Sequence, residues 1–333
     1  MNYNNYGKGM GMIENSKKIL YVVSTYYHAL ISCIKQLNCR KNADILVTAY
    51  IPDGDNLTVR IRDSGLFENV SYIGEVQQYK AENKLDYLFN YHKKNAELIE
   101  SQIDFDFCAY DEINIFHDDT WIAHYLKDKR ISYRLIEDAL NSFKVISKTC
   151  FAYMLPKRRL WCSFKRALGI GYVFCGFDKC TTEVEVNELD GLEIADFAKD
   201  RLVEVPRKLM FDALTEADKK VLRNVFMKAI PPIEPEKSVL LLTQPLYIDG
   251  TVSSEEEQIE IYKRLVAENI TDEKLVIKPH PRDLTDYSEA FPEAVIFDKN
   301  MPVEVVGMNI LSSFFNVIAV DSTALHWINK QWK

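Results

Sequence analysis

Short apolar runs and stretches of helical periodicity alternate along the first two thirds of the chain. The run Ile19–Ser24 is typical of a buried strand, and apolar residues then recur at helical spacing from Tyr27 to Leu37. Similar patterns predict strands at 43–51, 69–76, 105–112, 113–116 and 131–138, and helices at 84–101 and around 120–127. Strands that alternate with helices predict a parallel sheet covered by helices on both faces.

A second series of elements follows a proline-rich stretch near residue 230. Pro231, Pro232 and Pro235 lie directly after a charged helical segment at 215–228 and predict a linker. Beyond it, we expect strands at 238–246, 274–280, 294–298 and 316–320, and helices at 255–269, at 303–311 and from about residue 322. The sequence therefore predicts two Rossmann-like α/β domains, 13–230 and 237–333, that face a central cleft.

The charge balance excludes nucleic acid as a general partner. The chain has 41 Lys and Arg residues against 49 Asp and Glu residues, a net charge of −8, whereas phosphate backbones need a basic surface. Any anionic ligand must therefore be held by a local site.

Three features indicate a cytoplasmic protein. The seven cysteines form no CxxC pair, and their odd number is typical of reduced thiols. No apolar run approaches the ~18 residues of a membrane span. The first residues also lack the apolar core of a signal peptide.

The segment KPHPRD gathers cationic side chains at the end of a predicted strand. Lys278, His280 and Arg282 lie where ligands bind in open α/β sheets. Pro279 and Pro281 restrict the backbone on either side of His280 and hold it in a stiff turn. Such a cluster suits a ligand that carries a phosphate.

Several other positions are candidates for substrate contact. Ser322 and Thr323 begin the last predicted helix, where hydroxyls and free N–H groups bind anions, although simple helix capping explains them equally well. Thr25 and His28 lie at the first strand-to-helix turn, which faces the cleft in this architecture, and a structural role for His28 is an equally good interpretation. Gln244, after the strand that begins at residue 238, is a further candidate.

Acidic residues at strand ends are candidates for a general base. Glu137 and Asp138 follow an apolar run, and Asp249 precedes Gly250 in the second half of the chain. A carboxylate can take the proton from an attacking hydroxyl, and a nearby second carboxylate raises its pKa towards the working range. The same residues are also explained as helix-start or turn residues.

These segments together resemble bacterial sialyltransferases, in particular glycosyltransferase family 52, which includes lipooligosaccharide and capsule sialyltransferases. The resemblance rests on IED at Ile136–Asp138, on KPHPRD and on DSTAL from Asp321, and the stretches YVVSTYYHALI and TQPL are similar to the family too. It implies a GT-B fold.

The resemblance also implies roles for single residues. In such enzymes an Asp/Glu-Asp/Glu-Gly motif supplies the base, the histidine of His-Pro contacts the CMP phosphate, and Ser/Thr residues near the C-terminus hold that phosphate. Carried onto this chain, the roles fall on Glu137 or Asp138, on His280, and on Ser322 and Thr323. Ala139 stands where the motif has Gly, and Asp249 keeps the following Gly but lacks the first acid. The base is therefore open between Asp138 and Asp249.

The implied reaction is an inverting transfer of sialic acid from CMP-sialic acid to a hydroxyl of a surface glycan, lipooligosaccharide or capsule, without a metal or another cofactor. Two alternatives stay open. One is a transferase of another nucleotide-activated group, such as another sugar or CDP-glycerol. The other is a catalytically inactive nucleotide-sugar-binding protein. A homodimer is a further hypothesis.

Two patterns that suggest a metal have simpler explanations. Asp104-Phe105-Asp106 matches the DxD pattern of other glycosyltransferases, but its alternation predicts a strand with exposed carboxylates. His117, Asp118, Asp119 and His124 precede or enter a predicted helix, for which an Asp is an expected N-cap.

The stretch 155–172 is basic and amphipathic in an otherwise acidic protein. It has five Lys or Arg residues among Leu160, Trp161, Phe164 and Leu168. Such a helix can lie on the anionic inner membrane as a peripheral contact, or it can pack its apolar side on the core.

Overall fold

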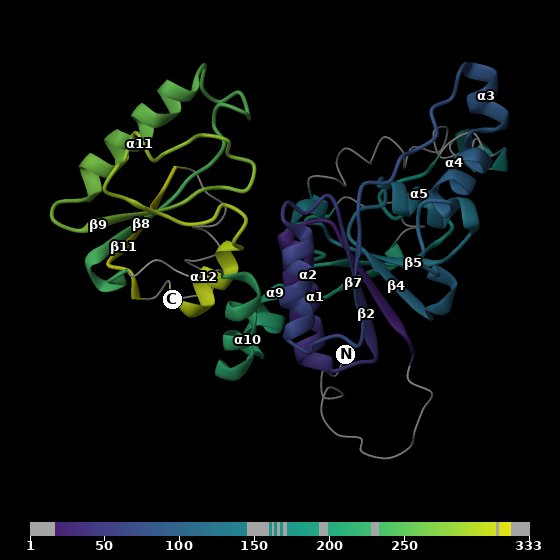
Figure 1. The fold of residues 1–333 in the computed structure, drawn as a ribbon, viewed down its shortest axis with the longest axis horizontal. Helices are drawn as coiled ribbons and strands as arrows, with labels where there is room; N and C mark the ends of the chain where they lie inside the picture. Colours follow the sequence, from purple (N-terminus) through teal and green to yellow (C-terminus); the bar gives the residue numbers. More distant parts are fainter. Residues whose placement is uncertain are drawn as a thin grey trace, which may run out of the picture.

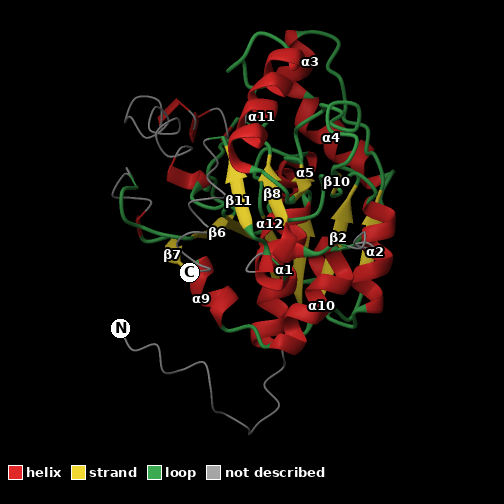
Figure 2. Ribbon diagram, turned by 90° about the vertical axis from the view of Figure 1, so that its left-hand side faces the viewer, coloured by secondary structure: helices red, strands yellow, loops and turns green. Residues whose placement is uncertain are grey.

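A computed structural model describes residues 17–144, 160–161, 163–164, 167–168, 172–192, 199–227, 233–310 and 313–320. The chain forms two lobes, each built on a parallel sheet with helices packed against it (Figures 1 and 2). This arrangement confirms the predicted α/β class, with two Rossmann-like halves of the GT-B type.

The first lobe contains a sheet with the strand order β3-β2-β1-β4-β5-β6-β7, and all of its strand pairs are parallel. The strands are β1 (Ile19–Val23), β2 (Ala43–Thr48), β3 (Val70–Ile73), β4 (Glu112–Ile115), β5 (Tyr133–Ile136), β6 (Thr181–Val186) and β7 (Leu202–Glu204). The helices of the N-terminal part are α1 (Tyr26–Cys39), α2 (Gly54–Asp63), α3 (Lys84–Phe89), α4 (Tyr91–Glu100) and α5 (Trp121–Lys129). Because β1 is buried along its whole length, its sequence is continuously apolar rather than alternating, whereas the equally buried β2 also contains Asp44 and Thr48.

The second lobe has a smaller sheet with the order β10-β9-β8-β11, again parallel. It consists of β8 (Ser238–Leu242), β9 (Lys274–Lys278), β10 (Val295–Ile296) and β11 (Asn316–Ala319), with helices α11 (Glu255–Asn269) and α12 (Val303–Asn309). The predicted boundary between 230 and 237 falls between the two sheets and lies partly outside the described residues.

Two helices before the linker connect the lobes. These are α9 (Arg207–Asp212) and α10 (Glu216–Phe226), which lie between the lobes in Figure 1. Helix α10 starts with a capping box from Thr215 and Asp218, and it contacts α1 and α2 of the first lobe as well as α12 of the second. One apolar cluster therefore runs through both lobes, with Leu222 and Phe226 next to residues of both sheets.

Some predicted elements differ from the structure. The predicted helix 84–101 is divided at Asn90 into α3 and α4. The predicted strand at 105–112 is wrong: Asp106 instead accepts a hydrogen bond from the Cys108 N–H and caps a short 3-10 turn at Phe107–Ala109, so the DxD residues lie outside the sheet. The helix near residue 120 is capped by Thr120 and not by an aspartate.

The thiols are free at Cys33, Cys39, Cys108 and Cys180, as predicted. Cys175 is disulfide-bonded, so the prediction of reduced thiols is wrong for this residue; its partner lies outside the described residues. Across the described parts of the chain, no helix is long and apolar enough to cross a bilayer.

Candidate functional site

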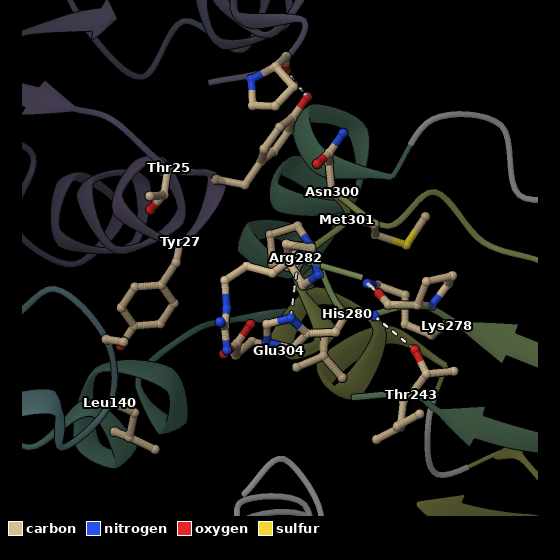
Figure 3. A pocket seen from close by; sticks show the side chains of 18 of the residues that line it. Thr25, Tyr27, Leu140, Thr243, Lys278, His280, Arg282, Asn300, Met301 and Glu304 are labelled. Carbon is tan, nitrogen blue, oxygen red and sulfur yellow. Dashed lines mark hydrogen bonds between the residues drawn. The ribbon is translucent and has the colours of Figure 1, made fainter. Parts of the chain in front are cut away.

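A cavity of about 620 Å³ lies between the two lobes. Thr25, Tyr27 and Leu140 approach it from the first lobe, and Lys278 and His280 approach it from the second (Figure 3). The volume is within the range of small-ligand sites, and the cavity lies beyond the carboxyl ends of strands, where α/β sheets bind ligands.

The second-lobe wall is built from the ends of the neighbouring strands β8 and β9. Thr243 follows β8; its Oγ1 accepts the His280 N–H at 3.2 Å and donates to the buried carboxylate of Asp283 at 2.7 Å. Asp283 also accepts from the Tyr287 hydroxyl at 2.7 Å and from the Gln258 amide at 3.2 Å. This network fixes the stiff turn predicted from the two prolines.

His280 presents one N–H group towards the cavity. Its Nδ1 accepts the Arg282 backbone N–H at 3.2 Å, so the proton of the neutral ring is on Nε2, which has no partner among the described residues. Burial, followed by the charges of Arg282 and Lys278, lowers the pKa of His280 to about 4. The imidazole is thus a neutral hydrogen-bond donor in the cleft.

Lys278 also lines the cavity. Its side chain is buried, and its Nζ donates to the carbonyl oxygens of Pro279 at 2.5 Å and Lys299 at 3.0 Å. Burial lowers the pKa of its ammonium group to about 8. Since an ammonium has three protons and two are used, one remains for a ligand.

Arg282 and Asp249 form an exposed pair at the edge of the second lobe. Both oxygens of Asp249 accept from the Arg282 guanidinium, at 2.8 and 3.1 Å. Arg282, Pro281 and Gln244 line the cavity, whereas Asp249 is not among its described lining residues. Asp249 would have to leave Arg282 to act as a base.

The two adjacent acids after β5 lie in different environments. Glu137 is buried, and its two oxygens accept the backbone N–H groups of Phe143 at 2.8 Å and Asn187 at 2.7 Å. Asp138 is partly exposed and lines the cavity. Its Oδ1 accepts two hydrogen bonds, and its Oδ2 has no partner in the described part of the chain.

The two groups that bind Asp138 Oδ1 come from the ends of neighbouring strands. His28, after β1, donates from Nε2 at 2.7 Å, and Nε2 of His117, after β4, lies 3.0 Å away. Since β1, β4 and β5 are adjacent in the sheet, their carboxyl ends bring these side chains together. Burial would raise the pKa of Asp138, but the hydrogen bonds from His117 and His28 outweigh it and hold the pKa below its ordinary value.

Thr25 and His28 take part in the same turn. Thr25 Oγ1 caps α1 by accepting the His28 N–H at 3.1 Å, and Thr25 lines the cavity. His28 is completely buried, and its ring stacks on Phe116 with a centroid distance of 4.3 Å. The structure therefore places His28 behind Asp138 and not in contact with the cavity.

His28, His117 and Asp138 are close enough together to suggest a metal site, because one ligand atom of each lies within 4.8 Å of the others. A histidine that binds a metal through Nε2 keeps its proton on Nδ1 and donates it to an acceptor. Nδ1 of His28 instead accepts the Ser24 N–H at 3.3 Å. The donor set therefore fits a hydrogen-bonded carboxylate better than a metal centre.

The residues Thr25, Asp138, Gln244 and 278–282 all line the cavity, whereas Glu137, His28 and Asp249 are not among its described lining residues. Ser322 and Thr323 lie outside the described residues. Glu304 and His117 are among the site residues that were not predicted as such. Glu304, in the first turn of α12, lines the cavity, and burial raises the pKa of its carboxyl. His117 belongs to the HDD pattern that suggested a metal, and nothing in its spacing indicates a partner at Asp138.

The fold and the cleft define a two-domain protein of the GT-B type. Comparison with known proteins adds the family: the model of glycosyltransferase family 52 matches residues 60–331. The chain belongs to glycosyltransferase family 52, as the sequence motifs indicated.

The single proteins and solved structures that resemble this chain match it at low identity or over part of its length. An uncharacterised protein of Haemophilus influenzae is 38% identical over 135 residues, which cover 39% of this chain and 42% of that protein. Similar solved structures include the glycotransferase of kitacinnamycin (10% identity, 95% and 78% of the two chains, TM-score 0.46) and the S. aureus MnaA-UDP co-structure (12%, 93% and 75%, TM-score 0.47). Likenesses this distant say nothing about the substrate.

Proposed function

We propose that this protein is a glycosyltransferase that moves sialic acid from CMP-sialic acid to a hydroxyl of a surface glycan, with inversion at the anomeric carbon and without a metal. One observation carries the proposal. The cavity is lined on the first lobe by Asp138, whose Oδ2 has no partner among the described residues. On the second lobe it is lined by Lys278 and His280, whose N–H groups can bind a phosphate. The family and the KPHPRD motif support the choice of donor.

Asp138 is the proposed base. The acceptor hydroxyl attacks the anomeric carbon and gives its proton to Asp138 Oδ2, while the bond from that carbon to the phosphate oxygen breaks. Attack from the face opposite to the leaving group inverts the centre. Asp138 is preferred to Asp249 because Asp249 has both oxygens bound to Arg282 and is not among the described residues that line the cavity.

The second-lobe wall stabilises the departing CMP. The phosphate gains negative charge as the bond breaks, and donors that are already in place stabilise it without reorganisation. The His280 Nε2–H group and the third proton of Lys278 are the described donors for this charge. The helix start at Ser322 and Thr323 is proposed, from the sequence, to bind the same phosphate.

Incubation of the purified protein with CMP-sialic acid, CDP-glycerol and UDP-linked sugars, with a lipooligosaccharide-type acceptor, tests the donor by mass spectrometry. We expect transfer only from CMP-sialic acid. Transfer from another donor would contradict the sialyltransferase assignment and favour a transferase of that other nucleotide-activated group. CMP binding without turnover of any donor would favour a binding protein.

Two carboxylate variants test the base. Asp138→Asn should lower kcat about 10²- to 10⁴-fold, the usual contribution of a general base, and leave CMP affinity unchanged. Asp249→Asn should lower kcat less than about tenfold. A larger loss of kcat in Asp249→Asn than in Asp138→Asn would identify Asp249 as the base and would not affect the assignment of the donor. Near-normal turnover by His280→Ala would contradict the stabilisation of the leaving group.

We also propose that the enzyme works on the surface of an anionic membrane. Leu160, Trp161, Phe164 and Leu168 are each more than half exposed, and Leu160, Phe164 and Leu168 follow one another at helical spacing. The Leu168 N–H donates to the Phe164 carbonyl at 3.1 Å, and the rings of Trp161 and Phe164 stack. The basic residues of this stretch complement anionic lipid, which would also bring a lipid-linked acceptor to the cleft.

Co-sedimentation with vesicles of phosphatidylglycerol, or of phosphatidylcholine alone, tests this surface. We expect binding to the anionic vesicles, and its loss in the Trp161→Ser/Phe164→Ser variant. Leu209→Ser, which changes an equally exposed apolar residue on α9, is the matched control. If the double variant instead abolished a dimer and kept vesicle binding, the surface would be a contact between two copies.

A further inference from the structure

Two histidines bind the same oxygen of Asp138, but their surroundings differ. His28 is completely buried, whereas the side chain of His117 is 34% exposed. Their Nε2 atoms lie 2.7 and 3.0 Å from Asp138 Oδ1. Each ring can therefore donate a hydrogen bond that fixes the carboxylate of Asp138. The two rings differ in whether they can also carry a positive charge.

His28 is held in its neutral form. Its Nδ1 accepts the Ser24 N–H at 3.3 Å, so no proton can be added there without breaking that bond. Its ring also stacks on Phe116 and is closed off from water. Burial lowers the pKa of His28, although the hydrogen bond to Asp138 acts in the opposite direction. His28 therefore donates one neutral hydrogen bond at every working pH.

His117 is surrounded by carboxylates. Its Nε2 lies against Asp138, and its Nδ1 lies 3.9 Å from the exposed carboxylate of Asp119, with Asp118 on the same loop. His28, from α1, is the other titratable group that faces the ring, at a centroid distance of 5.1 Å. Burial lowers the pKa of His117, but Asp138, Asp119 and Asp118 outweigh it and raise the pKa above its ordinary value.

We propose that His117 is a positioning residue that sets the basicity of Asp138 through its own charge. The proposal rests on the role of Asp138 as the base. When His117 is an imidazolium, Asp138 is half of an ion pair and accepts a proton from the acceptor poorly. When His117 loses its Nδ1 proton, its Nε2–H still donates to Oδ1, so the carboxylate keeps its position and regains its basicity.

The consequence is a pH dependence that belongs to His117. In the wild type, kcat/KM for the acceptor should rise with pH around a midpoint above 6.5, the ordinary value for histidine. At pH 5.5, at least one unit below that midpoint, the rate should be lower than its plateau by a factor of about ten or more, as for any single-proton titration. If His117 had only a structural role, its replacement would lower the rate at every pH and leave the shape of the pH–rate profile unchanged.

The test compares His117→Gln with His28→Gln in the full-length protein between pH 5 and 9. Glutamine keeps an N–H donor near the position of Nε2 and cannot be protonated. We expect His117→Gln to lose the acid limb, so that its rate at pH 5.5 is within about twofold of its own plateau. His28→Gln removes the other histidine that binds Asp138 Oδ1, the one that stays neutral. This variant should keep the fall in rate at acid pH with the wild-type midpoint, whatever its maximal rate. An unchanged limb in His117→Gln would overturn the proposal.

A second measurement does not depend on turnover or on the stability of the variants. The ring of His117, followed by ¹⁵N NMR in the wild type, should titrate above 6.5, and this midpoint should fall in Asp138→Asn. A midpoint that does not move would also overturn the inference. If no donor supports transfer, the proposed function fails, and this titration still decides whether Asp138 and His117 are coupled.

Discussion

The stability of the first lobe should depend on the buried carboxylate of Glu185 on β6. Its Oε1 accepts from Arg207 at 2.6 Å, and its Oε2 accepts from Lys35 at 2.6 Å and lies 3.2 Å from Arg134. The backbone carbonyl of Glu185 also accepts the Glu137 N–H at 2.9 Å, directly below the cleft. This cluster therefore supports the strand end that carries Asp138.

The pKa of Glu185 gives the size of the effect. Burial would raise the pKa, but Lys35, Arg207 and Arg134 lower it from 4.5 to about 2. A shift of 2.5 units at 1.36 kcal/mol each gives about 3 kcal/mol. Because the folded-state pKa is depressed, this stability is present above pH 4.5 and is lost as the pH falls towards 2.

Glu185→Gln replaces the ionised group with a neutral group of the same size. The free energy of unfolding, from urea denaturation followed by tryptophan fluorescence and circular dichroism, should fall by about 3 kcal/mol at pH 7 and by about 1.5 kcal/mol at pH 3. Glu183→Gln is the matched control, since Glu183 binds the same Arg134 but is half exposed, and it should cost at most ~1 kcal/mol. A cost below 1 kcal/mol for Glu185→Gln, or an equal cost at both pH values, would refute the reasoning.

Two further predictions concern the second lobe and a tight turn. Lys278 loses its charge as the pH rises through about 8, so calorimetry should show CMP binding weakening above that pH; Lys278→Met should weaken binding about tenfold at pH 7 and remove this dependence. Gly176 has a φ of +74°, and an added Cβ would lie 2.3 Å from Val184 Cγ2, so Gly176→Ala should cost ~1–3 kcal/mol in thermal unfolding. Gly65→Ala, at a φ of +64° in open space, should cost less, and equal losses would mean that the clash has no effect.

The sequence was sufficient for much of the fold because several buried parallel strands, such as β1, are marked by apolar runs. The predictions for β1 and α11 are confirmed in place and type, and β8 begins where predicted but ends at Leu242. β6 was not predicted, because TTEVEV places two acids on a strand; their partners, Arg134, Lys35 and Arg207, are distant in sequence. Helix α2 was also missed, since its start at Asp53-Gly54 reads as a turn.

The site could be predicted only where its residues are close in sequence. KPHPRD forms a single turn, so its place in the cavity followed from the strand before it. The choice between Glu137 and Asp138 could not be made, because both are acids at one strand end and only the packing shows which one faces the cleft. The contacts of His28 and His117 with Asp138 join residues 110 and 21 positions apart, and no local pattern records them.

Helix α10 gives the molecule a property that its two sheets alone would not suggest. Its residues Leu222, Val225 and Phe226 belong to an apolar cluster that also contains Leu240 of β8 and Val305 of α12. A fragment that ends before the linker would expose the face of α10 that meets the second lobe, and a fragment that begins after it would leave α12 uncovered. The two lobes are separate as sheets but share one interior. The chain should therefore unfold as a single cooperative unit, and each lobe made alone should aggregate or lose its structure.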